Sequence, residues 1–196
     1  MGKKRLPTSA RGETVRGDII DAANRLFYHR GYNQTSFTDI AEVSGVPRGN
    51  FYYYFKNKDE ILGAVIDFRV EHIRAMLADW DAVESDPRQR LKWFTQMIRG
   101  SEKDLLRYGC PMGSLNIELG KAQPALKARA RKMFDLFIDW LTRQLTSLEH
   151  ADAAKFALQI MGRAQGIAVM AQVYGDREFM RSQLAEFDAW IESLPG

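Results

Sequence analysis

Apolar residues recur with the spacing of α-helices along almost the whole chain of 196 residues. This periodicity limits the possible folds more than any other feature of the sequence, because patterns typical of half-buried strands are nearly absent. The first apolar stripe consists of Val15, Ile19, Ala22, Ala23, Leu26 and Phe27. Gly31 follows it as a left-handed helix stop. We therefore predict an all-α protein with nine helices and no strands.

Local start and stop signals divide the first half of the chain. Ser36 and Asp39 form a variant capping box at the start of a short helix over residues 36–44. A three-residue turn around Gly45 leads to a third helix that starts at Pro47 and ends near Phe55. A second capping box over residues 57–60 opens a long helix that runs to about residue 80.

The second half continues in the same way. Asp86 and Pro87 open a helix that runs beyond residue 105, and a short helix then ends at Gly120. Pro124 starts the next long helix. Residues 152–174 form a helix rich in Ala and Gly, and the last helix begins after it at Asp176.

Positive charge is concentrated at the start of the chain. Residues 1–58 hold ten Lys and Arg against five acids, a net +5, whereas the remaining residues carry −2 and the whole chain +3. This distribution favours an anionic partner for the first part only. We expect a flexible basic arm over 1–13, a three-helix DNA-binding domain over 14–57 and a second helical domain over 58–196.

Composition excludes several classes of protein. Cys110 is the only cysteine, so no disulfide forms within the chain, and the three histidines lack metal-ligand spacing. No secretory signal or apolar run long enough to cross a membrane is present in the sequence. We therefore expect a cytoplasmic, bacterial-type protein with no metal, no cofactor and no membrane partner.

Residues 35–58 contain the pattern most informative about function. Two short helices joined by a Ser-Gly-Val turn match a helix-turn-helix unit. In its second helix, Arg48 and Asn50 have the chemistry to read guanine and adenine in the major groove. Tyrosine hydroxyls, lysines and the first turn of a helix can anchor phosphates. Phe51 and Phe55 are expected to be core residues, since they are spaced i and i+4.

These residues also carry a family resemblance. The motifs are Ala22-Ala-Asn-Arg-Leu-Phe27, Gly31-Tyr32, Thr35-Ser-Phe-Thr-Asp-Ile-Ala41, Gly45-Val-Pro-Arg-Gly-Asn-Phe-Tyr-Tyr-Tyr-Phe55 and Lys58. Together they resemble the amino-terminal domain of the tetracycline-repressor (TetR/AcrR) family over about residues 15–62. The resemblance implies a homodimeric repressor that binds a palindromic double-stranded DNA operator and is released by a ligand.

The same resemblance implies roles for individual residues. Base contacts come from Arg48, Asn50 and Tyr53, with Gly49 allowing the backbone to approach the DNA. The implied phosphate contacts are Thr35, Ser36, Tyr52, Tyr54 and Lys58. Pro47 and Tyr54 depart from the commonest family pattern, which has Ser or Thr and His at these positions, and this leaves the operator sequence open.

Cys110 lies in a segment that resembles one branch of the family. Residues 109–120 are similar to repressors of the N-ethylmaleimide-reductase type, which sense electrophiles through a cysteine at this point. A thiol just before a helix that starts near Met112 can react as a thiolate, with Lys103 and Arg107 nearby in sequence. The alternative is an inert, buried cysteine, which is the usual state of a free cysteine.

A ligand pocket is expected among the middle helices, because helical bundles build cavities from facing helices. Its candidate lining, besides Cys110, is Phe68, His72, Met76, Trp93, Met97, Met112, Phe134, Phe137 and Met161. Each of these could equally be a plain core residue, and His72 a structural histidine.

The last two helices are expected to form the dimer interface. Gly162 and Gly166 would let a partner backbone approach closely, and Phe179, Phe187 and Trp190 would add apolar surface. The alternative is that these helices pack only within one protomer.

Two other functional classes have less support in the sequence. A helical enzyme has little support, because no catalytic motif is present and Glu118, near Cys110, has no matching histidine. A helical adaptor would bind a protein through the basic head and would lack the steep salt dependence of DNA binding.

Overall fold

The computed structural model describes residues 8–120 and 123–194, without the side chains of residues 8–11, Glu13 and Arg48. These residues form ten α-helices and no strand, which confirms the all-α class. Residues 1–7 of the expected basic arm lie outside this description. The first helix, α1 (Thr8–His29), extends further toward the N-terminus than predicted, so residues 8–13 are helical.

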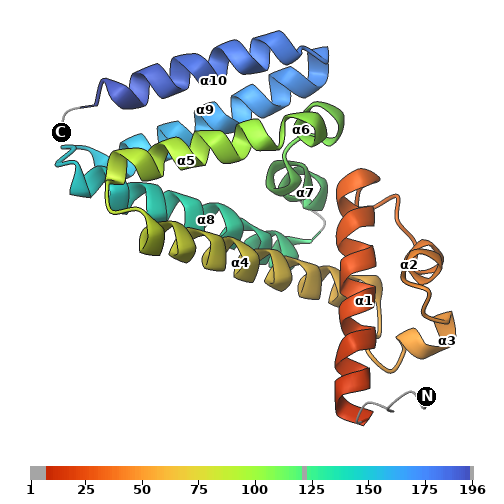
Figure 1. The fold of residues 1–196 in the computed structure, drawn as a ribbon. Helices are drawn as coiled ribbons and strands as arrows, with labels where there is room; N and C mark the ends of the chain where they lie inside the picture. The colour runs from red at the N-terminus through yellow and green to blue at the C-terminus, as the bar shows by residue number, and fades with distance from the viewer. Residues whose placement is uncertain (1–7, 121–122, 195–196) are drawn as a thin grey trace, which may run out of the picture.

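The head consists of α1, α2 (Phe37–Ser44) and α3 (Arg48–Phe51), which gather at one end of the molecule (Figure 1). The predicted local signals set these helices. Ser36 and Asp39 form a reciprocal capping box at the start of α2, and Gly45 ends that helix at φ 67°. The predicted third helix is α-helical only as far as Phe51, and hydrogen-bonded turns continue it to Phe55.

The helix α4 (Lys58–Val83) leads from the head into the body (Figure 1). Asn57 caps α4 by accepting a hydrogen bond from the Glu60 amide (2.9 Å), as predicted. The Glu60 carboxylate accepts a hydrogen bond from the Lys56 amide (2.8 Å). A full capping box would use the amide of the N-cap residue Asn57 instead. The remaining helices of the body are α5 (Pro87–Gly100), α6 (Glu102–Tyr108), α7 (Pro111–Leu119), α8 (Pro124–Ser147), α9 (Ala153–Tyr174) and α10 (Arg177–Glu192).

One predicted helix is divided in the structure, which gives ten helices in the described residues where nine were expected. The helix that starts after Asp86 ends at Gly100, and α6 begins after Ser101. The Ser101 hydroxyl donates to the Met97 carbonyl (3.0 Å), a local bond that competes with regular helix geometry. Gly100 is a weak helix former, so the break falls where the helix is least stable.

The hydrophobic core of the head continues into the body. It holds Ile19, Ala22, Phe51 and Phe55 together with buried residues of α4, from Ile61 to Val70. Leu115 and Leu119 of α7 and Ala130 and Met133 of α8 join the same cluster. The first turns of α4 therefore pack as part of the head, although α4 runs on into the body. A second cluster fills the body between α4, α5, α8, α9 and α10.

Within the described residues, none of the helices has the length and apolar character needed to cross a membrane. The same part of the chain contains no group of three or more His, Cys, Asp and Glu side chains that could hold a metal ion.

Candidate functional site

The turn after α3 presents polar and aromatic side chains to solvent. Tyr52 and Tyr53 are 63% and 85% exposed, and Gly49 and Asn50 are also exposed. Neighbouring exposed aromatic and polar side chains of this kind form a surface that a partner can cover. Phe51 is fully buried. Within one turn, the expected core residue therefore faces inward and the expected DNA-contact residues face the solvent.

Two neighbouring residues differ from this pattern. Tyr54 is partly buried and packs against the head core, so its ring is a structural element of the head. The backbone of Arg48 begins α3, while its side chain lies outside the described part of the structure. Phe55 is buried as expected, and Arg16 of α1 lies over its ring, 5.1 Å from the centroid.

Thr35 and Ser36, two of the implied phosphate contacts, are engaged within the head. Thr35 is 1% exposed, and its hydroxyl donates to the Gly31 carbonyl (2.7 Å). Ser36 uses both its hydroxyl (2.6 Å) and its amide (2.7 Å) to donate to the Asp39 carboxylate. These hydrogen bonds hold the pKa of Asp39 below its ordinary value. The donors of both residues therefore stabilise the α1–α2 loop and the start of α2 in the free protein.

Lys58 is turned toward the same loop. Its ammonium donates to the carbonyls of Tyr32 (2.9 Å) and Thr35 (3.0 Å) and lies 4.2 Å from the centroid of the Tyr32 ring. A lysine has three N–H donors, so one is left for another acceptor. Sequence pattern alone could not show this, because the partners lie 23 and 26 residues earlier in the chain.

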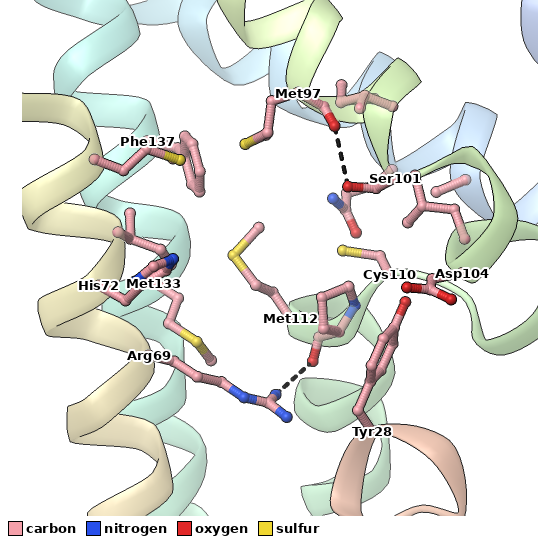
Figure 2. Close-up of a pocket in the computed structure, with 18 of the residues that line it drawn as sticks. Tyr28, Arg69, His72, Met97, Ser101, Asp104, Cys110, Met112, Met133 and Phe137 are labelled. Atoms are coloured by element: carbon pink, nitrogen blue, oxygen red, sulfur yellow. Dashed lines mark hydrogen bonds between the residues drawn. The ribbon is translucent and has the colours of Figure 1, made fainter. Parts of the chain in front are cut away.

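A cavity of about 520 Å³ lies where the body meets α1 of the head, and α4, α5, α6, α7, α8 and α9 form the rest of its wall. Its size falls in the range of small-molecule sites. The structure places eight of the ten predicted residues in its wall: Phe68, His72, Met76, Met97, Cys110, Met112, Phe137 and Met161. Figure 2 shows several of them around the open space.

Trp93 and Phe134 do not line the cavity. Trp93 packs edge-on against Trp80 (6.2 Å between centroids), and Phe134 packs against the core of the body. Both lie on amphipathic helices, and periodicity alone does not say which apolar residues of a helix border a hollow. The plain core interpretation therefore holds for these two residues.

Several residues of the wall were not predicted from the sequence. Asn24 and Tyr28 belong to α1 of the head, and Arg69, Asp104 and Gln165 are polar side chains of the body. The sequence could have indicated Met133 as a wall residue, because Met133 lies one helical turn before Phe137. It could not have indicated the polar residues, since their place in the wall depends on how α1 packs against the body.

Arg69 connects three helices at the edge of the cavity (Figure 2). Its guanidinium donates to the side-chain oxygen of Asn24 (2.7 Å), to the Asn24 carbonyl (3.2 Å) and to the Pro111 carbonyl (3.1 Å). Burial lowers the pKa of Arg69 to about 10, so the group is still a cation at neutral pH.

Tyr28 makes a second contact between head and body. Its hydroxyl donates to the Gly109 carbonyl (3.0 Å), immediately before Cys110. Burial, followed by the nearby charge of Asp104, raises the pKa of Tyr28 to about 12, so the phenol is neutral and remains a hydrogen-bond donor.

Cys110 is buried, 8% exposed, at the junction of α6 and α7. It is the N-cap residue of α7, and its sulfur accepts a hydrogen bond from the Gly113 amide (3.5 Å). The guanidinium of Arg107 lies over the ring of Tyr108, 5.1 Å from the centroid. The cysteine therefore combines a capping role with a position in the cavity wall.

Glu118, near the end of α7, forms a third contact with the head. Its carboxylate accepts hydrogen bonds from the amides of Tyr32 (2.9 Å) and Asn33 (2.6 Å) in the α1–α2 loop. The same carboxylate stands against Gly31, where an added Cβ would come within 2.9 Å of it. Glu118, weighed above only as a weak catalytic candidate, is thus a structural link between head and body.

The outward face of α9 is apolar and uncovered. Leu158, Val173 and Tyr174 are 61%, 67% and 72% exposed, and Val169 and Met170 lie on the same side. Gly162 and Gly166 are exposed, and, apart from their sequence neighbours and the backbone of α9 itself, no atom of the described part of the chain lies within 4 Å of where their Cβ atoms would be.

The three aromatic residues named for the interface on the last helix, α10, make contacts within their own protomer. Phe187 is fully buried, because α10 turns this side toward α5 and α9 of its own chain. Trp190 is partly buried and stacks on Phe156 of α9 (6.1 Å between centroids), and Phe179 also packs partly against the body core. These three aromatic residues therefore stabilise the protomer, and the uncovered apolar surface belongs to α9.

Comparison with known proteins identifies both parts of the chain. Residues 19–65 match the model of bacterial regulatory proteins of the tetR family, and residues 87–187 match the tetracyclin repressor-like C-terminal domain. An HTH-type transcriptional regulator in the lacX 3′ region of Lactococcus lactis subsp. lactis is 30% identical over 162 residues, which cover 80% of this chain and 78% of the relative.

Solved structures share the fold. A TetR transcriptional regulator from Legionella pneumophila aligns with a TM-score of 0.80 at 23% identity, over 99% of this chain and all of the other. The reduced form of Escherichia coli NemR aligns with a TM-score of 0.77 at 18% identity, over 88% and 94% of the two chains, a likeness in fold alone. The chain belongs to the TetR family of helix-turn-helix transcriptional regulators.

Proposed function

We propose that this regulator binds a palindromic operator as a homodimer, represses transcription, and is released when an effector binds the cavity of the body. The observation that carries the DNA-binding part is the exposed surface of α3 and the turn after it. Asn50, Tyr52 and Tyr53 project from a short segment whose Phe51 is locked in the core. Arg48 and Gly49 complete this surface as the proposed base-contact and close-approach positions.

Phosphate contacts are proposed from groups that keep free donors. Tyr52 is exposed, and Lys58 retains one N–H beyond its two loop contacts, so both can bond phosphates. The exposed Tyr53 is proposed to contact bases, as Arg48 and Asn50 do. Thr35 and Ser36 act indirectly, by holding the start of α2 in place. A protein that reads DNA in this way works where the bacterial chromosome is, so we place it in the cytoplasm.

The dimer is proposed to form through the outward face of α9. Its exposed apolar residues and two uncovered glycines suit close packing against a second copy. A two-fold pair of heads can engage successive major grooves about 34–36 Å apart. This arrangement limits the operator to an inverted repeat with that spacing.

The trigger is proposed to be a small molecule in the cavity. Modification of Cys110 is a second candidate trigger, because the thiol lines the same cavity and caps α7. If Cys110 is only structural, non-covalent ligands alone release the operator.

Selection of genomic DNA fragments by the purified protein tests the proposal. The selected fragments should share an inverted repeat, and binding to it should weaken steeply as salt rises. Asn50→Ala should weaken binding by about 1–3 kcal/mol and relax the preference at one base of each half-site. Gln96→Ala, an exposed amide on α5, is the matched control and should bind as the wild type does. Unchanged sequence preference in Asn50→Ala would remove Asn50 from the interface.

A further inference from the structure

The cavity wall contains a cation whose recorded hydrogen-bond partners are all neutral. Arg69 donates to one amide oxygen and two carbonyl oxygens, and no ion pair with a carboxylate is recorded for it among the described residues. A guanidinium carries five N–H donors, of which these contacts use three. Arg69 is half-buried, and a cation partly withdrawn from water is costly unless an anion compensates it.

The other ionisable groups of the wall do not supply that anion. Asp104 is its only acidic residue among those described, and Arg25, His29 and His72 also line the cavity. Figure 2 draws Asp104 beside Tyr28 and Cys110, whereas Arg69 reaches in from α4 toward the start of α7. The wall therefore holds more fixed positive charge than negative, and the exposed side chains of Arg25, His29 and His72 contribute basic groups to it.

The remainder of the wall is apolar and adaptable. Five methionines and three phenylalanines line it: Met76, Met97, Met112, Met133, Met161, Phe68, Phe94 and Phe137. Methionine side chains are flexible and polarizable, so they fit apolar groups of varied shape. An apolar chamber with a half-buried cation in its wall is complementary to a molecule that has an apolar body and one anionic end.

We propose that the effector is an organic acid whose carboxylate pairs with Arg69 while its alkyl or aryl body occupies the methionine-lined space. The planar guanidinium favours a carboxylate, because the two can form parallel charge-assisted hydrogen bonds. This inference rests on the proposal that the cavity holds the effector.

The position of Arg69 also connects the acid to the DNA-binding head. Its present partners belong to α1 and to the first residue of α7, so the guanidinium holds these two helices together. A carboxylate can accept from the two N–H donors left on the terminal nitrogens, and its charge then draws the guanidinium toward the cavity and away from the Asn24 and Pro111 oxygens. Binding of the acid then loosens a contact between head and body, which supplies a differential interaction between two conformers.

Calorimetric titration of the DNA-free protein with matched acid and amide pairs tests the anion site. The probes are 4-phenylbutyrate with 4-phenylbutanamide and octanoate with octanamide. In each pair the molecules have nearly the same shape, and only the acid is charged. We expect the acid of at least one pair to bind about tenfold or more tightly than its amide. Equal affinities within each pair, or no binding of any probe, would overturn the proposal.

Three variants assign the preference to Arg69. Arg69→Gln should abolish the preference of the acid over the amide. Asn24→Ala removes one of the same contacts but keeps the cation, so it should retain the preference even if it destabilises the protein to a similar degree. Arg74→Gln removes an exposed cation five residues along α4 and should behave as the wild type does. A preference that survives in Arg69→Gln contradicts the assignment.

The result is distinguishable from the test of the proposed function, because these titrations contain no DNA. Acids that bind through Arg69 without releasing the operator would contradict the proposed switch and leave the anion site standing. If the protein binds the operator and only neutral molecules release it, the proposed function stands and the anion site is contradicted.

Discussion

Replacement of Glu118 should uncouple α7 from the DNA-binding head. The Glu118 carboxylate accepts two backbone hydrogen bonds, from the Tyr32 and Asn33 amides at 2.9 and 2.6 Å. Bonds to a charged acceptor contribute about 1.5–3 kcal/mol each when buried. The Asn33 contact is exposed and water can replace it, so we expect Glu118→Ala to lower the free energy of unfolding by about 2 kcal/mol in total. Glu118→Gln keeps an acceptor oxygen without the charge and should cost about 1 kcal/mol.

Two measurements check this expectation. Urea unfolding gives the loss of global stability, and a loss of about 2 kcal/mol corresponds to a fall of roughly 4–8 °C in Tm for a chain of this length. Amide hydrogen exchange gives the local effect, because the two amides concerned lose their acceptor. Their protection should fall by about 5- to 30-fold, the factor that corresponds to 1–2 kcal/mol.

The neighbouring residue provides the control. Ile117 is 77% exposed on the same helix, so Ile117→Ala should change stability by less than about 0.5 kcal/mol and leave exchange in the loop unaltered. If Glu118→Ala unfolds at the wild-type urea concentration and the Tyr32 and Asn33 amides exchange at the wild-type rate, the inferred contact does not hold the loop.

Three further outcomes are expected. Cys110→Ser should preserve operator binding, because Ser also caps helices, but it should abolish release of the operator by N-ethylmaleimide. Unchanged release by this reagent would leave only the non-covalent trigger. Val173→Glu places a charge on the exposed face of α9 and should give folded monomers by light scattering, whereas Ile117→Glu should remain dimeric; dimers of both would place the interface elsewhere. The folded pKa of Tyr28, about 12, lies above its ordinary value of 10, so its contribution to stability is complete below about pH 10 and is lost as pH rises toward 12. The ring is only half-buried, so urea midpoints should show a loss of about 1 kcal/mol that is absent in Tyr28→Phe.

Features decided by neighbours in the chain could be predicted from the sequence. Ser36 and Asp39 form the expected capping box, Gly45 takes the expected left-handed conformation, and Asp86 caps the helix that Pro87 begins. In each case the interacting groups lie within about four residues of one another. The helix-turn-helix unit was recognisable for the same reason, since its start, turn and buried phenylalanines are all local.

Features that depend on packing between distant segments could not be predicted. Periodicity showed that Phe187 belongs to an apolar face of α10, but only the fold shows that this face turns to α5 and α9 of the same chain. The sequence indicated Lys58 as a phosphate contact, but it could not show that two of the N–H groups of Lys58 bond carbonyls of the α1–α2 loop, 23 and 26 residues earlier. The contacts of Arg69 span 42 and 45 residues and those of Glu118 span 85 and 86, so no sequence window contains both partners.

The contacts at the two ends of α7 explain how a ligand in the body could act on the head. At its start, Pro111 bonds Arg69, and Gly109 just before it bonds Tyr28 of α1. At its end, Glu118 holds the loop that leads to α2.

The first turns of α4 cannot move independently of the head, because Ile61, Leu62 and Ile66 are fully buried in the head core. Relative motion of head and body therefore has to be taken up further along α4, where this helix borders the cavity. Leu115 and Leu119 of α7 are buried in the same head core, so α7 is coupled to the head as well. Since Cys110 and Met112 also belong to α7 or its cap, either a ligand in the cavity or an adduct on the thiol would act on the same nine-residue helix.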